Sequence, residues 1–157
     1  MRSSLIAVGA AALLGASATA ISETREVDSV SHFVVTQDGD PYETPAGEEG
    51  VYGEIMHATQ IEADGRTSSQ WCVGEVSLSG DNGGVGMAGY CTIIHDNGDA
   101  LFTSYIGPGG GQPSQWTVMG GTGEFAGATG SGTSTTVSQR GDGEAWTVKH
   151  TGTLTTK

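Results

Sequence analysis

Short runs rich in Val, Ile, Thr, Tyr and Trp recur along this chain, and turns rich in Gly, Asp and Asn separate them. After residue 20, no window repeats apolar residues at the i, i+3, i+4 and i+7 positions of an amphipathic helix. This pattern of strand formers and turn residues predicts strands throughout. Eight strands are expected, over residues 30–36, 53–63, 70–79, 84–95, 100–107, 114–119, 125–138 and 144–155. The fold class is therefore predicted to be all-β.

Residues 1–20 differ in composition from the rest of the chain. They carry a basic residue at Arg2, an apolar run over residues 5–14, and small residues ending in Ala18-Thr19-Ala20. This is the layout of a secretory signal peptide, so we expect cleavage near Ala20 and a secreted or periplasmic protein. The apolar run is too short to cross a hydrocarbon core of about 30 Å. A membrane partner is therefore not expected, and a retained anchor is the less favoured alternative.

The remaining residues, 21–157, suffice for one domain with a sizeable core and are too few for two. We expect an N-terminal strand and an acidic loop over residues 21–52, and the remainder of the same domain over residues 53–157. Five basic residues stand against eighteen acidic ones in this part of the chain. Such a surface repels nucleic acid and anionic lipid, so neither is an expected partner.

Neither the acidic residues nor the histidines predict a metal site. The acidic residues of segment 36–50 follow no EF-hand spacing, which favours a solvated loop over a calcium site. The four histidines, His32, His57, His95 and His150, lie on separate segments without an H-x-x-x-H pair. Zinc is therefore not expected. No metal and no cofactor is predicted.

The two cysteines predict one hairpin register. A two-residue turn at Asp81-Asn82 would place Cys72 directly opposite Cys91, whereas a turn at Asn82-Gly83 would place Cys72 opposite Ile93. An even number of cysteines in an exported protein favours a disulfide, which requires Cβ atoms roughly 4 Å apart. The first register and a Cys72–Cys91 disulfide are therefore predicted. A reactive thiol is the alternative.

A second hairpin is predicted at residues 96–99, with a two-residue turn at Asn97-Gly98. This register pairs Ile93 with Phe102. Chained to the first hairpin, it defines a nearly apolar face that should point inward. The predicted ligand-binding residues of this inner face are Val76, Met87, Ile93 and Phe102, and the opposite, outer face would carry Thr103 and Tyr105.

Sequential antiparallel strands with one apolar face most simply close into an eight-stranded antiparallel up-and-down barrel. Closure also explains the glycine-rich segment 120–134, GGTGEFAGATGSGTS. This segment lacks the lysine of a phosphate-binding loop, and its glycines do not follow the spacing of a dinucleotide fingerprint. We interpret it as a kinked barrel strand with its entry turn, where bulk is not tolerated. Residues 53–157 would then form most of one barrel.

Residues 116–128, WTVMGGTGEFAGA, resemble the GGTGxFxGAxG signature of the dirigent and allene oxide cyclase barrel superfamily, especially its small exported bacterial members. Residues 89–91 and 96–99 are similar to the preceding segment of those proteins, and the resemblance covers about residues 70–135. It implies a calycin-like, eight-stranded barrel with an apolar cavity. Plant members of the superfamily cyclise an oxylipin epoxide or steer the radical coupling of phenols, often as trimers or dimers. The resemblance therefore implies a homodimer or homotrimer.

Two functions remain open from the sequence. The first is an exported barrel that binds an apolar small molecule in its lumen. The alternative is a cofactor-free cyclase or isomerase that acts on an oxylipin-like or phenolic substrate. Such a reaction needs a shaped cavity and one or two polar groups that stabilise developing charge. The candidate catalytic residues are His57, His95 and Ser104.

Overall fold

The computed structural model describes residues 22–39, 42–43, 50–78, 84–108, 112–141 and 143–157. The predicted signal peptide and segment 44–49 of the acidic loop lie outside the described residues. The strands are β1 (Glu23–Asp38), β2 (Tyr42–Glu43), β3 (Gly50–Glu62), β4 (Thr67–Leu78), β5 (Gly84–His95), β6 (Ala100–Gly107), β7 (Ser114–Gly121), β8 (Thr129–Gln139) and β9 (Ala145–Thr156), with one 3₁₀ turn, η1 (Gly123–Phe125).

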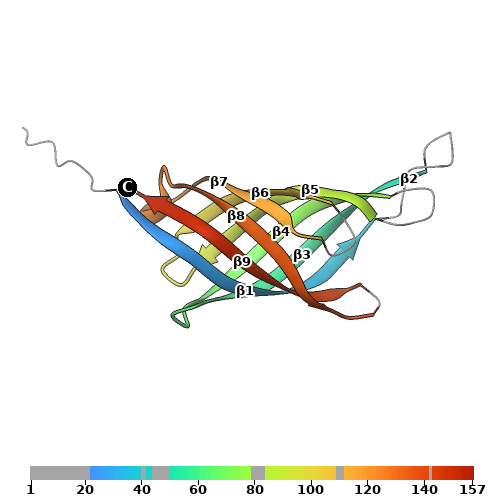
Figure 1. Cartoon of the computed structure of the whole chain (residues 1–157), viewed down its shortest axis with the longest axis horizontal. Helices are drawn as coiled ribbons and strands as arrows, with labels where there is room; N and C mark the ends of the chain where they lie inside the picture. The colour runs from blue at the N-terminus through green and yellow to red at the C-terminus, as the bar shows by residue number, and fades with distance from the viewer. Residues whose placement is uncertain (1–21, 40–41, 44–49, 79–83, 109–111, 142) are drawn as a thin grey trace, which may run out of the picture.

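The strands form one closed antiparallel barrel. Around the barrel the order is β1-β9-β8-β7-β6-β5-β4-β3, and β3 pairs with β1 to complete the circle. The short β2 extends the sheet beside β3. In Figure 1 the blue start of β1 and the red end of β9 run side by side, in a register that pairs Glu23 with Thr156. The predicted eight-stranded barrel is confirmed.

The first strand, β1, is longer than the predicted strand 30–36. Its 16 residues pair with two neighbouring strands: residues 23–34 pair with β9, and residues 29–38 pair with β3. A closed barrel leaves no free edge, so the polar sequence before Val30 joins the sheet through backbone hydrogen bonds to β9. This pairing could not be read from side-chain pattern alone.

The glycine-rich segment 120–134 divides into a strand end, a connection and a strand start. Gly120 and Gly121 end β7, η1 follows, and β8 begins only at Thr129. Gly123 and Gly127, in the connection, have φ angles of 53° and 72°, which glycine adopts without steric cost. The predicted barrel strand is therefore correct from residue 129 onward, and residues 122–128 form a folded connection.

The predicted register of β4 and β5 is confirmed. Cys72 pairs with Cys91, and the two form a disulfide with a Cα–Cα distance of 4.1 Å. Val76 lies opposite Met87, as the register set by the two cysteines requires. Leu78 pairs with Gly84 instead of Val85, because the register shifts by one residue after Ser77. The turn that was predicted at residues 81–82 lies outside the described residues.

The predicted register of β5 and β6 is wrong by one residue. Ile93 pairs with Leu101, not with Phe102. The connection is a three-residue loop, in which the Gly98 amide donates to the His95 carbonyl and Gly98 has a φ of 85°. This is a type I turn followed by a glycine bulge, one residue longer than the expected turn. A shift of one residue turns every side chain of β6 to the other face.

Glycines on β5, β8 and β9 make room inside the barrel for two large aromatic side chains. A Cβ atom on Gly132 would lie 2.5 Å from Cζ2 of Trp116, and one on Gly152 would lie 2.7 Å from the same atom. A Cβ on Gly89 would lie 2.5 Å from the Tyr105 hydroxyl oxygen. Carbon atoms in contact need about 3.5–4.0 Å, so glycine at these positions lets both rings pack against the inner wall of the barrel.

We expect Gly132→Val to destabilise the barrel by about 1–3 kcal/mol, because the added side chain would collide with the Thr151 carbonyl oxygen and with the Trp116 ring. Chemical denaturation measures the change in the free energy of unfolding. Gly141→Val is the control, since a Cβ at Gly141 would meet no atom within 4 Å. Equal losses of stability in the two variants would show that the packing of the Trp116 ring does not require glycine at position 132.

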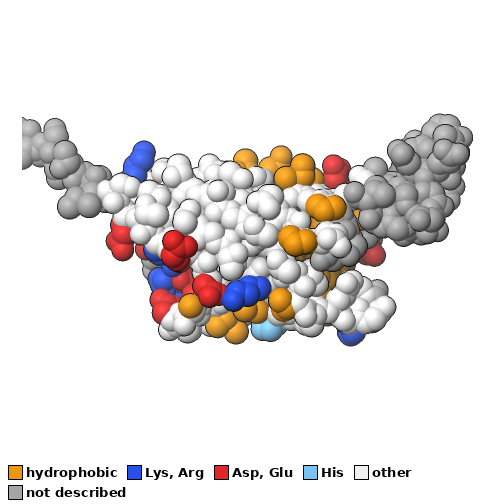
Figure 2. Space-filling model, viewed as in Figure 1, with side chains coloured by type: hydrophobic (Ala, Val, Ile, Leu, Met, Phe, Trp, Pro, Cys, Tyr) orange, Lys and Arg blue, Asp and Glu red, His pale blue; other side chains and the backbone are white. Residues whose placement is uncertain are grey.

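The outer surface differs between the ends and the side of the barrel. Figure 2 shows mostly uncharged polar surface over β8 and β9, with charged side chains gathered toward the end where β1 begins. Within the described residues, no helix is long and apolar enough to cross a membrane.

Candidate functional site

The barrel encloses a cavity of about 400 Å³. Its walls are mainly apolar, and all eight barrel strands contribute side chains to it. This volume lies within the roughly 300–1,000 Å³ typical of small-molecule sites. The cavity lining includes Arg25, Phe33, Met56, Gln60, Glu62, Gln70, Cys72, Met87, Cys91, Ile93, His95, Leu101, Thr103, Tyr105, Trp116, Ser134, Thr136, Trp146, Val148, His150 and Leu154.

Aromatic rings form a large part of the cavity wall. Phe33 on β1 and Trp146 on β9 are stacked, with ring centroids 5.6 Å apart and an interplanar angle of 17°. Tyr105 on β6 and Trp116 on β7 complete the aromatic lining. Flat rings favour stacked or edge-on contact with other aromatic rings. The cavity is therefore well suited to an aromatic guest.

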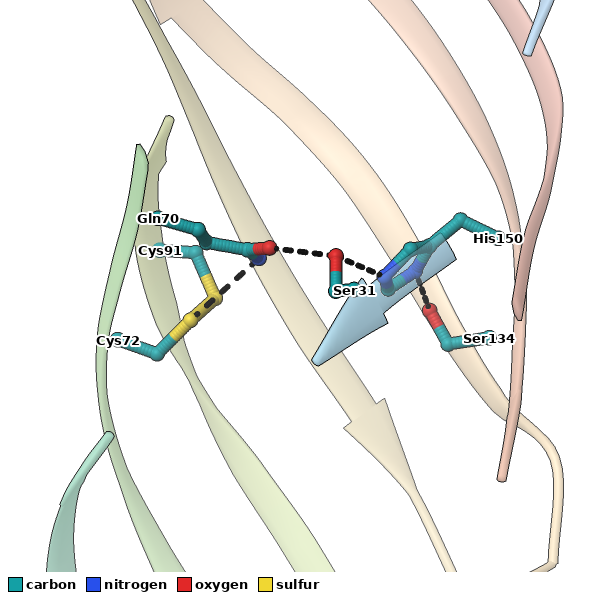
Figure 3. Close-up of a disulfide and its surroundings, with 6 residues drawn as sticks. All are labelled: Ser31, Gln70, Cys72, Cys91, Ser134 and His150. Carbon is teal, nitrogen blue, oxygen red and sulfur yellow. Dashed lines mark hydrogen bonds between the residues drawn. A yellow bond between two sulfur atoms is a disulfide. The ribbon is translucent and has the colours of Figure 1, made fainter. Parts of the chain in front are cut away.

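A chain of buried polar side chains crosses the lumen from β8 to the disulfide (Figure 3). Ser134 Oγ lies 2.7 Å from His150 Nδ1, and His150 Nε2 lies 2.9 Å from Ser31 Oγ. Ser31 Oγ donates to Gln70 Oε1 at 2.9 Å, and Gln70 Nε2 donates to Cys72 Sγ at 3.5 Å. Side-chain hydrogen bonds inside the barrel thus join β8 and β9 at the end of the chain with β1 and β4.

The donor-to-acceptor direction of these hydrogen bonds follows from the disulfide at one end of the series. A disulfide sulfur has no proton, so Gln70 must turn its amide nitrogen toward Cys72 and its oxygen toward Ser31. Ser31 then uses its single proton on Gln70 and can only accept from His150 Nε2. His150 is therefore the tautomer protonated at Nε2, and Ser134 donates its proton to the bare Nδ1.

Burial keeps two titratable groups of the lumen, His150 and Tyr105, neutral. It lowers the pKa of His150 to about 4, so the imidazole carries no charge at neutral pH. Burial, assisted by the Glu54 carboxylate, raises the pKa of the Tyr105 phenol. Tyr105 therefore remains protonated. The centre of the cavity holds dipoles without full charges, which suits an uncharged ligand.

Three buried polar atoms have no hydrogen-bond partner within the described part of the chain: Gln60 Oε1, Ser68 Oγ and Trp116 Nε1. The other end of the Gln60 amide donates to Ser29 Oγ at 2.9 Å. Leaving a buried polar group unpaired costs about 1–3 kcal/mol. Gln60 and Trp116 are among the residues that line the cavity.

One end of the cavity has a charged rim. Arg25 donates to Glu62 at 2.8 Å, and Arg66 contacts the same carboxylate oxygen at 2.8 Å. His95 Nδ1 lies 3.9 Å from Glu62, and its ring packs on buried Phe125 with centroids 4.6 Å apart. Burial lowers the pKa of His95, and Glu62 opposes part of that shift. Phe125 thus supports the rim from the η1 connection.

The four predicted ligand-binding residues are divided by the structure. Met87 and Ile93 line the cavity. Val76 is partly buried but lies outside the cavity wall. Phe102 is 38% exposed on the outer surface, because of the one-residue shift in β6. Thr103, expected on the outer face, lines the cavity instead.

The three candidate catalytic residues do not come together. His95 lies at the rim of the cavity, whereas His57 is exposed on β3. Ser104, next to Thr103 on β6, lies outside the cavity wall for the same reason as Phe102. These positions bring no two of the three residues into one site.

The sequence alone indicates neither the hydrogen-bonded polar side chains around His150 nor the unpaired Nε1 of Trp116. Closure of the barrel brings Ser31 beside His150, 119 positions apart in sequence. No local motif reports such a contact. The alternation of Gly and Ser or Thr in β8 was the available signal, because it marks inward positions that leave room for a ring from β7. Within the described residues, no group of three His, Cys, Asp or Glu side chains is placed to hold a metal ion.

No protein-family model matches this chain, and no curated protein matches it in sequence. The fold is similar to that of solved dirigent proteins. The pterocarpan synthase dirigent protein GePTS1 matches over 92% of this chain and 99% of its own, with a TM-score of 0.60 and 16% identity. The pterocarpan synthase dirigent protein PsPTS1 matches over 84% and 94%, with a TM-score of 0.55 and 15% identity. The resemblance inferred from residues 116–128 is thus confirmed for the barrel fold.

Proposed function

We propose that the barrel binds a phenolic small molecule in its lumen and holds it in one orientation, as a dirigent-type protein. The observation that carries this proposal is the cavity of about 400 Å³, with aromatic walls and a few inward polar atoms. The two similar solved structures, both of pterocarpan synthase dirigent proteins, support the same class of function. Orientation alone can direct a reaction, because it replaces a random encounter with one fixed geometry.

The lining of the cavity favours a phenol over a fatty or charged ligand. Stacked Phe33 and Trp146 offer ring faces, and the unpaired Gln60 and Trp116 offer one acceptor and one donor. A phenol matches both features, since it combines a flat ring with a hydroxyl group. His150, neutral because burial lowers its pKa to about 4, offers no charge for a carboxylate at neutral pH. We therefore prefer a phenolic ligand to an oxylipin-like one.

We also propose that this function is carried out outside the cytoplasm. The Cys72–Cys91 disulfide lies in the barrel wall, and disulfides persist mainly in oxidising compartments. The composition of residues 1–20 supports export.

The experiment is a calorimetric titration of the mature protein with para-propylphenol. We expect saturable binding to wild type and none to Thr136→Phe, whose new ring would enter the cavity. Thr135→Phe is the matched control, because the neighbouring side chain is exposed on the outer face of β8. Its binding should equal that of wild type. Loss of binding in both variants, or in neither, would contradict a lumen site.

A further inference from the structure

We propose that Ser134 and Trp116 form a subsite that recognises the ligand's hydroxyl group. In this subsite Ser134 Oγ accepts the proton of the hydroxyl, and Trp116 Nε1 donates to an oxygen of the ligand. This inference rests on the proposed phenolic ligand and adds the residues and the direction of each hydrogen bond. It assigns the specificity of the cavity to the wall formed by β7, β8 and β9.

The register of the sheet places the two groups in adjacent rows. Ser134 pairs with His150 across β8 and β9, and the next inward pair along the same strands is Gly132 with Gly152. The Trp116 ring lies over that glycine pair, since Cζ2 would contact a Cβ at either position. Trp116 also pairs with Gly132 across β7 and β8. The indole and the Ser134–His150 pair are therefore direct neighbours on one wall.

Ser134 faces the cavity as an acceptor. Its single proton is used on His150 Nδ1, because the hydrogen-bond chain is directed from Ser134 to the disulfide. Its lone pairs are left for the lumen, and a hydroxyl group can donate to them. An ether oxygen or a phenolate has no proton to give, so neither can form this bond.

Trp116 lines the same wall of the cavity and carries an unpaired donor. The residue is 8% exposed, and its Nε1 has no partner within the described residues. An indole N–H can only donate. A buried donor with no acceptor is a rare and costly feature, and a ligand oxygen in contact with Nε1 would satisfy it. Together the two groups select a ligand whose oxygen both donates and accepts.

The test compares three ligands of similar shape: para-propylphenol, para-propylanisole, which lacks the hydroxyl proton, and propylbenzene, which lacks the oxygen. Dissociation constants are measured for wild type, Ser134→Ala and Trp116→Phe. We expect the preference for phenol over anisole to fall about fivefold in Ser134→Ala, the value of one neutral hydrogen bond. The preference for anisole over propylbenzene should fall by a similar factor in Trp116→Phe. The ratio of dissociation constants for two ligands is compared between wild type and each variant, so the difference in hydration free energy between the ligands cancels.

The matched controls are Ser131→Ala and Trp71→Phe. Both residues are exposed on the outer face of the barrel, so both variants should keep the wild-type ratios. Unchanged ratios in Ser134→Ala and Trp116→Phe, with binding retained, would overturn the subsite and leave the proposed function standing. Failure of wild type to bind any of the three ligands would overturn the proposed function as well.

A second measurement does not require a variant of Trp116 to fold. The three tryptophans give three indole N–H signals in a nitrogen-15 correlation spectrum. The Trp116 signal should move downfield with para-propylphenol and para-propylanisole but not with propylbenzene, and the Trp71 signal should stay in place. In the same sample, the nitrogen shifts of His150 should report a proton on Nε2. A Trp116 signal that responds equally to all three ligands, or a His150 proton on Nδ1, would overturn the assignment.

Discussion

Replacing Cys72 and Cys91 together by alanine is expected to lower the free energy of unfolding by about 3 kcal/mol. The disulfide joins residues 19 positions apart and restricts the unfolded chain over that loop. It also contributes packing, because Cys72 is fully buried and Cys91 nearly so. Equilibrium denaturation in guanidinium chloride measures the loss.

Thiol titration provides the control for this prediction. The denatured, unreduced wild type should show no reactive thiol, and the reduced protein should show two, because the chain has only two cysteines. Two reactive thiols before reduction would contradict the disulfide. A double alanine variant as stable as wild type would mean that the hairpin register does not depend on it.

Lowering the pH is expected to destabilise the barrel through His150 by on the order of 3 kcal/mol between about pH 7.5 and about pH 4. Burial lowers the pKa of this imidazole from 6.5 in the unfolded chain to about 4 in the barrel. Below the unfolded pKa, the unfolded state therefore binds a proton that the native state does not. The contribution of His150 is fully present above pH 6.5 and is lost as the pH falls toward the folded value.

His150→Gln isolates this term from the carboxylates that titrate in the same range. The variant should be less stable than wild type at neutral pH, because it interrupts the hydrogen bonds to Ser31 and Ser134, but its stability should depend less on pH. His57→Gln is the control, since His57 is exposed on the outer face of β3. Equal pH dependence in wild type and His150→Gln would show that His150 titrates normally.

The fold could be predicted from the sequence because several independent signals agreed. The alternation of strand formers and turn residues gave eight strands, and the cysteine pair set the register of β4 and β5. Once Cys72 and Cys91 are opposite each other, Val76 must face Met87, as it does. A disulfide fixes register because its geometry tolerates no slip of one residue.

The register of β5 and β6 could not be predicted in this way, because no disulfide joins these two strands. Asn97-Gly98 fits both a two-residue turn and a three-residue loop with a glycine bulge, and the local sequence does not decide between them. The structure has the longer loop, with Gly98 at a φ of 85°. This one residue moved Phe102 and Ser104 outside and Thr103 inside.

The centre of the candidate site depends on closure of the barrel. Ser31, Gln70, Ser134 and His150 come from four separate strands, and each looks like an ordinary polar strand residue in the sequence. Their contact follows from β1 pairing with both β9 and β3. Polar residues that meet only through the tertiary fold carry no spacing signal, so they were found only in the structure.

The most direct test of the lumen as the binding site is a methyl carbon–proton spectrum recorded during titration with para-propylphenol. Ile93 and Ile94 are neighbours on β5 that face opposite sides of the wall, the first lining the cavity and the second 47% exposed outside. We predict that the methyl signals of Ile93, Leu101 and Val148 shift in a saturable way while those of Ile94 and Ile106 do not move. Shifts at Ile94 and Ile106 without shifts at Ile93 would place the ligand on the outer surface and contradict a binding site in the lumen.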